Sequence, residues 1–167
     1  MRSVTFLLVA LLAVSAAGAE PSAKPAKVYG EWRILIKPDK GGEYNALIEK
    51  KGLPLFREAG GRMVGWWTTL IGNLYEHVTI WEYDDMAAFE RAVEFLGKEK
   101  RFAEFVSERD PLLAGEESRF LRLLPWAEPP ALPESAKFVV HEIHRVPAKE
   151  RANYLRYMRE EGIKILK

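Results

Sequence analysis

The chain has 167 residues, 48% of them apolar, with 25 basic against 24 acidic side chains and no cysteine. The near-neutral charge, without a basic stripe, excludes a nucleic-acid-binding protein, because phosphate neutralisation dominates such affinity. The lack of cysteine excludes disulfides and thiol catalysis, so we expect one globular domain stabilised by packing alone.

The first 19 residues have the parts of a secretory signal peptide: Arg2, an apolar run over 4–14, and an A-x-A site at 17–19. The alternative is a membrane anchor, but Val4–Ala19 has sixteen residues, fewer than the roughly 20 that span a bilayer. We therefore expect cleavage near Ala19, an exported protein in the periplasm or outside the cell, and no stable membrane anchor. Cleavage leaves 24 basic residues against 24 acidic ones.

The rest of the chain divides into four parts by composition. Residues 20–27 are a flexible lead-in, and 28–124 form the globular domain. The prolines in 125–135 predict a stiff, extended linker. Residues 136–167 predict a short strand followed by a helix.

The globular part begins with a predicted strand, Tyr29–Ile36, in which Glu31 and Arg33 share one face and the even-numbered residues share the other. A proline breaks this strand. Asp39 is then a predicted cap for a helix that ends near Gly52.

A predicted hairpin comes next, with Met63–Ile71 and Tyr75–Tyr83 on either side of Gly72-Asn73. Asp84-Asp85 then predicts the start of a second helical region, and Ser118–Leu124 is the last predicted strand. The order βαββαβ predicts an α+β, ferredoxin-like domain with a four-stranded antiparallel sheet.

Two helical regions cover only one face of such a sheet. On the strand 75–83 we expect Val78 and Ile80 to face the helices, and His77, Trp81 and their aromatic neighbours to face away. An exposed aromatic face usually marks an interface, so we expect a homodimer with the two sheets face to face. The alternative is that the C-terminal unit covers this face within one chain.

Three groups of residues resemble the NIPSNAP family in order and spacing. They are EWR at 31–33, GWWTT with IG at 65–72, and VTIWEYD at 78–84. Arg91 stands where the family has a helical arginine, whereas Phe102 or Phe105 replaces a family tryptophan. The resemblance covers about 28–124 and implies a dimeric α+β barrel. The family's activity is largely unestablished, so the resemblance implies no reaction.

A weaker similarity lies inside the chain. YNALIEKKGLPLFR at 44–57 aligns without gaps with YLRYMREEGIKILK at 154–167, and Glu31-x-Arg33 has a counterpart in Glu142-x-His144. One interpretation is a partial second repeat, whose strand pairs with a sheet edge or exchanges with a partner chain. The other is coincidence between two amphipathic helices.

The candidate ligand-binding residues are Glu31, Arg33, His77 and Trp81. We expect Arg33, His77 and Trp81 to line one barrel lumen, with Glu31 beside them in an ion pair with Arg33. His77 is the best catalytic candidate because its reference pKa suits a general base; the alternative is a hydrogen-bonded core or interface histidine.

Other site chemistry is scarce in this sequence. His141 and His144 lack the H-E-x-x-H spacing and would point to opposite sides of a strand, so we expect no metal there. No phosphate-cradling glycine loop or dinucleotide fingerprint is present, so we expect no cofactor.

Two classes of function remain. The first is a non-catalytic dimeric module that binds a small apolar ligand or a protein partner. The alternative is a small enzyme, similar to the cofactor-independent or haem-using monooxygenases of the dimeric α+β barrel group. That analogy rests on the fold alone, which is weak evidence for function, and we prefer the first.

Overall fold

The computed structural model describes residues 26–124, 126–127 and 139–162 of the chain. Four antiparallel strands form one sheet in the spatial order β2-β3-β1-β4. The strands are β1 (Val28–Ile36), β2 (Arg62–Thr68), β3 (Glu76–Tyr83) and β4 (Leu113–Arg122). This interleaved order confirms the predicted ferredoxin-like α+β fold. The predicted signal peptide and most of the predicted linker lie outside the described residues.

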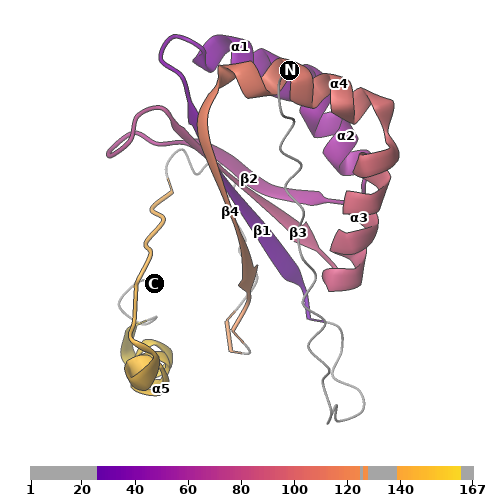
Figure 1. Cartoon of the computed structure of the whole chain (residues 1–167). Helices are drawn as coiled ribbons and strands as arrows, with labels where there is room; N and C mark the ends of the chain where they lie inside the picture. The colour runs from indigo at the N-terminus through magenta and orange to yellow at the C-terminus, as the bar shows by residue number, and fades with distance from the viewer. Residues whose placement is uncertain (1–25, 125, 128–138, 163–167) are drawn as a thin grey trace.

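Helices lie on one face of this sheet (Figure 1). Between β1 and β2 come α1 (Gly41–Leu47), the π-helical turn η1 (Ile48–Gly52) and α2 (Leu53–Glu58). Between β3 and β4 come α3 (Met86–Lys98), α4 (Lys100–Arg109) and the short 3-10 turn η2 (Asp110–Leu112). None of the described helices packs extensively on the other sheet face. We call that other face the open face.

Local signals explain several element ends. Asp85 Oδ1 accepts a hydrogen bond from the backbone N–H of Ala88 at 2.6 Å, so the predicted cap of α3 is confirmed. The turn between β2 and β3 contains Gly72 with a φ of +118°, a conformation that favours glycine. The predicted cap at Asp39 is wrong. Asp39 adopts a φ of 65°, and α1 follows Lys40 without a side-chain cap.

The last strand is longer than predicted. β4 begins at Leu113 instead of Ser118 and pairs with β1 along almost its whole length. Its early part carries Glu116 and Glu117, both exposed, which hid the strand pattern. Charged side chains are common on edge strands, where they discourage pairing with other chains.

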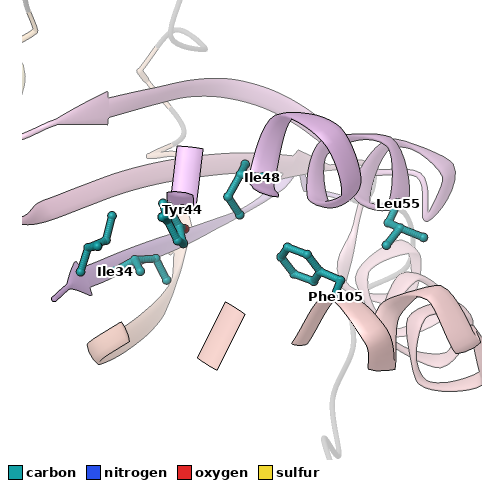
Figure 2. Close-up of a cluster of buried hydrophobic side chains, with 6 residues drawn as sticks. Ile34, Tyr44, Ile48, Leu55 and Phe105 are labelled. Carbon is teal, nitrogen blue, oxygen red and sulfur yellow. The ribbon is translucent and has the colours of Figure 1, made fainter. Parts of the chain in front are cut away.

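The main core lies between the helices and the sheet face that carries Ile34 and Ile36. Figure 2 shows this cluster, whose labelled members are Ile34, Tyr44, Ile48, Leu55 and Phe105. Phe105 of α4 is fully buried. Full burial of an apolar side chain of this size contributes about 1.5–3 kcal/mol to the free energy of unfolding. Phe105 therefore anchors α4 to the first helical region, which consists of α1, η1 and α2.

The orientation that the sequence predicted for β3 is wrong. Trp81 and Tyr83 form a second core cluster with Ala92 of α3, so they face the helices. Val78 and Ile80 alternate with them and therefore lie on the open face. The period of two along a strand shows which residues share a face but not which face is covered. Because both sets on β3 contain apolar side chains, the pattern could not decide.

The C-terminal unit, residues 139–162, stands apart from the sheet in Figure 1. Its helix α5 (Arg151–Tyr157) packs mainly on its neighbours η3 (Ala148–Glu150) and η4 (Met158–Gly162). The predicted strand is absent from the described residues 139–147. Val140 there is 83% exposed, and a strand forms only when its backbone finds a hydrogen-bonded neighbour.

Candidate functional site

The four predicted ligand-binding residues do not share one lumen. Cross-strand pairing places Arg33 opposite Val78 and Glu31 opposite Ile80, on the open face. His77 and Trp81 face the helices. The hypothesis that Arg33, His77 and Trp81 line one cavity is therefore wrong, because it depended on the wrong orientation of β3.

The open face carries a buried carboxylate. Glu31 is 1% exposed, and its Oε1 atom has no hydrogen-bond partner among the described residues. The predicted ion pair between Glu31 and Arg33 is replaced by another pair. Arg33 Nη2 donates to both carboxylate oxygens of Glu76 at 2.8 Å. A buried carboxylate oxygen without a donor is costly, so Glu31 marks a place on this face that a further donor would stabilise.

A second charged group lies at the far end of the open face. Glu82 is buried and accepts hydrogen bonds from Lys27 at 2.6 Å and from Arg62 at 3.1 Å. Burial alone would raise the pKa of Glu82, but the hydrogen bonds from Arg62 and Lys27 outweigh it and lower that pKa to about 2. Glu82 is therefore a permanent anion at neutral pH.

A cleft opens on the helix side, between the first helical region and the β2–β3 hairpin. It has a volume of about 230 Å³. Its lining side chains are Asn45, Glu49, Trp66, Thr68 and His77. Thr68 and His77 are cross-strand partners, so both point to the same face of the sheet. We call this feature the His77 cleft.

The surroundings of His77 hold its neutral ring in one tautomer. The indole Nε1–H of Trp66 donates to His77 Nδ1 at 3.2 Å, and an indole nitrogen can only donate. Nδ1 is therefore unprotonated, and the neutral ring carries its proton on Nε2. Burial also lowers the pKa of His77, which is 5% exposed. The ring of Tyr44 packs edge-on at 5.4 Å and fixes its plane.

The cleft offers polar groups that are not otherwise engaged. Asn45 Oδ1 is buried without a hydrogen-bond partner in the described part of the chain. No hydrogen bond to His77 Nε2 is found among the same residues, and Glu49 is exposed. No motif in the sequence marks Asn45, Glu49 or Thr68 as site residues, because they come together only in the folded chain.

In the C-terminal unit, His144 lies away from the His77 cleft and has its own side-chain partners. His144 Nε2 lies 3.1 Å from Glu142, and its Nδ1 lies 2.8 Å from the hydroxyl of Tyr154. Both nitrogens thus have protein partners. Within the described ranges no group of three or more metal-ligating side chains comes together.

The sheet order and its one-sided helix layer define a ferredoxin-like α+β domain. Over the residues described, no helix is both long and apolar enough to cross a bilayer. The sequence model of the NIPSNAP family matches residues 33–128, more than half of the chain. The chain therefore belongs to the NIPSNAP family, as the motifs at 31–33 and 65–84 predicted.

Solved structures agree with this assignment. A NIPSNAP family protein from Agrobacterium tumefaciens is 21% identical with a TM-score of 0.58, over 64% of this chain and 93% of that one. A NIPSNAP-like domain protein from Burkholderia xenovorans is 25% identical with a TM-score of 0.58, over 66% and 97%. A second Burkholderia xenovorans NIPSNAP domain protein is 24% identical with a TM-score of 0.58, over 61% and 99%. No curated protein matches the chain.

Proposed function

We propose that this NIPSNAP domain is an exported, non-catalytic binding module that works as a homodimer, with the open faces of two copies packed together. The observation that carries this proposal is the open face itself. Leu35, Trp67, Val78 and Ile80 lie on it, and each is only half-buried in the single chain. A contiguous apolar patch of this kind usually marks an interface.

The charges on the open face support a second copy as the occupant. Negative groups (Glu31, Glu76) and positive groups (Arg33, Arg119) lie on it together, so a second copy related by a two-fold rotation can bring opposite charges to this face. Glu31 Oε1 and Arg33 Nε are both buried without a hydrogen-bond partner in the described chain. A partner copy would supply donors and acceptors for these groups.

The geometry at His77 supports binding over catalysis. A general base needs a free lone pair within reach of the substrate. The basic nitrogen of His77 is occupied by Trp66, so His77 offers the cleft a hydrogen-bond donor. The same geometry argues against the monooxygenase alternative, for which His77 was the expected acid-base group.

The proposed ligand site differs from the one that the sequence predicted. The apolar ligand was expected in a lumen lined by Arg33, His77 and Trp81, which does not exist. Trp81 is a core residue, whereas the His77 cleft is lined mainly by polar groups. We therefore place small-molecule binding in the His77 cleft and assembly on the open face.

Export rests on residues 1–19, outside the described part of the chain. The A-x-A site supports removal of Met1–Ala19, which leaves a mature chain that begins at Glu20. Native mass spectrometry of the protein secreted from cells that express the full sequence tests processing and assembly together. We expect the mass of two chains that each start at Glu20. A monomer at high micromolar concentration overturns the dimer, and a chain that retains residues 1–19 in the membrane fraction overturns export.

A matched pair of variants locates the interface. Ile80→Asp places a charge on the open face and should convert the dimer to a folded monomer, because burying an unpaired charge is costly. Val93→Asp makes the same change on the outer side of α3, where Val93 is half exposed, and should leave the dimer intact. Sedimentation velocity measures assembly, and circular dichroism verifies folding. Equal behaviour of the two variants would mean that the interface lies elsewhere.

A further inference from the structure

We infer that the His77 cleft binds a small, neutral, planar molecule that presents a hydrogen-bond acceptor beside a hydrogen-bond donor, as a primary carboxamide does. This inference rests on the proposed binding role of the module and names the ligand class. It does not depend on the dimer. Four features of the cleft carry it: its size, the donor on His77, the acceptors opposite, and the indole wall.

The size of the cleft limits the ligand. Pockets for drug-sized molecules have volumes of about 300–1,000 Å³, whereas this cleft has about 230 Å³. It also lies open at the sheet edge, between helix α1 and the outer strand β2. A single ring with one polar substituent fits such a space.

The donor is the Nε2–H of His77. The hydrogen bond from Trp66 fixes the proton on Nε2, and Thr68, the cross-strand partner of His77, lines the same cleft. The His77 side chain is 5% exposed, so its orientation is set by packing before any ligand arrives. A ligand that uses this donor must bring an acceptor oxygen or nitrogen.

The acceptors are Asn45 Oδ1 and the carboxylate of Glu49. These two residues are four positions apart in the first helical region, so they share one helix face. Asn45 Oδ1 is buried and unpartnered among the described residues, which is costly unless a donor arrives. The anionic Glu49 at the mouth disfavours a negatively charged ligand. A neutral group that can also donate is therefore preferred.

The remaining wall is aromatic. Trp66 lines the cleft. Its ring lies edge-on to the ring of Tyr44, with the two ring centroids 6.3 Å apart. This contact and the bond to His77 hold the indole in place. A flat ligand ring packs favourably on such an aromatic surface, edge-on or in offset stacking. Together the groups select an aromatic or heteroaromatic amide over an aromatic acid.

Benzamide and benzoate test the inference, because they share one shape and differ in charge and in the donor. In nitrogen–proton correlation NMR spectra of the full chain, benzamide should shift the indole N–H signal of Trp66, which Trp66→Phe identifies by its loss. Benzoate should bind at least about tenfold more weakly, which corresponds to about 1.4 kcal/mol. No shift with benzamide up to its solubility limit, or equal binding of the two probes, overturns the inference.

Variants identify the groups that bind. His77→Phe keeps a flat ring but removes the donor and should abolish the benzamide shift, whereas His141→Phe, at an exposed position, should leave it unchanged. If His77→Phe does not fold, Glu49→Gln decides: it removes the negative charge at the mouth of the cleft and should reduce the preference for benzamide, because benzoate binding becomes severalfold stronger. Unchanged selectivity in Glu49→Gln contradicts the assignment. The oligomeric state of each sample is measured in parallel, so a failure of the ligand inference is distinguishable from a failure of the proposed dimer.

Discussion

The hydrogen bond from Trp66 Nε1 to His77 Nδ1, 3.2 Å long, determines the chemistry that His77 offers to its surroundings. Without it, a histidine on β3 is a candidate base with a reference pKa near neutrality. With it, the ring is a neutral donor. Protonation of Nδ1 would break this bond and would place a charge in a buried site, which agrees with the lowered pKa of His77. One neighbouring donor thus makes this histidine a hydrogen-bond donor instead of a candidate base.

The lowered pKa of His77 has a consequence for stability. The unfolded chain binds a proton at His77 near pH 6.5, whereas the folded chain does so only at lower pH. The contribution of His77 to the free energy of unfolding is therefore fully present above about pH 6.5. It falls as the pH drops towards the pKa of the folded state. We expect His77→Gln to show a shallower loss of stability over this range than the wild type.

Urea denaturation at a series of pH values measures this effect. His141→Gln is the control, because His141 is exposed and lies outside the core. It should keep the wild-type pH dependence. If His77→Gln and wild type lose stability in parallel as the pH falls, then His77 is not the residue responsible.

At the scale of elements, the π-helical turn η1 links α1 to α2 and brings the first helical region against α4. π-helices are rare and usually occur as single turns. The C-terminal unit has the same order: a seven-residue α-helix, α5, is followed by a five-residue π-helical turn, η4, and each turn ends in a buried glycine. A partial second repeat would produce this order. That hypothesis stays a prediction, and the lack of a strand in 139–147 shows that the second unit is not a full copy.

Gly52, at the end of η1, packs closely against Phe105 of α4. A Cβ atom there would meet Phe105 Cε2 at 3.1 Å and Ile48 Cδ1 at 3.3 Å. We expect Gly52→Ala to lower the free energy of unfolding by about 1–2 kcal/mol, because overpacking outweighs the gain in helix propensity. Gly97→Ala is the matched control: Gly97 lies in α3 with no atom within 4 Å of the added Cβ, and the change should stabilise by about 0.5–1 kcal/mol.

Chemical denaturation of the two glycine variants measures both values. The two substitutions should change the free energy of unfolding in opposite directions. If both substitutions stabilise the protein, then Phe105 moves aside easily and does not fix the distance between the first helical region and α4.

At the scale of the whole molecule, the sheet separates two environments. The helix side holds Trp81 in a core cluster with Tyr83 and Ala92, and the same layer contains the His77 cleft. The open face holds Glu31 and the paired charges of Arg33 and Glu76. The proposed assembly surface and the proposed ligand site thus lie on opposite faces of the sheet. A change at one site should therefore leave the other intact.

Trp81 tests this separation. Since its ring packs edge-on against Phe56 at 5.4 Å inside the single chain, we expect Trp81→Ala to lower the free energy of unfolding by about 3–5 kcal/mol. The loss should be equal at low and high protein concentration, because it arises within one chain. Thermal and urea unfolding at two concentrations measures it. A loss confined to high concentration, where the proposed dimer would dominate, would place Trp81 at the interface instead.

Some features of this protein follow from its sequence because their cause is local. The apolar alternation of 29–36, the Asp85 cap and the turn at Gly72 each act within a few residues, and the order of such signals predicted the ferredoxin-like fold. The motifs at 31–33 and 65–84 predicted the NIPSNAP family for the same reason, since their order and spacing are visible in one dimension.

Only the tertiary structure decided which face of β3 the helices cover. The alternation along 76–83 gives two apolar sets of residues, and a period of two carries no information about which set is inside. The tautomer of His77 and the polar lining from Asn45 and Glu49 depend on contacts between α1, β2 and β3. These partners are distant in the sequence. The sequence by itself therefore determined the fold and the family, whereas the candidate site arose from side chains that meet only after the chain has folded.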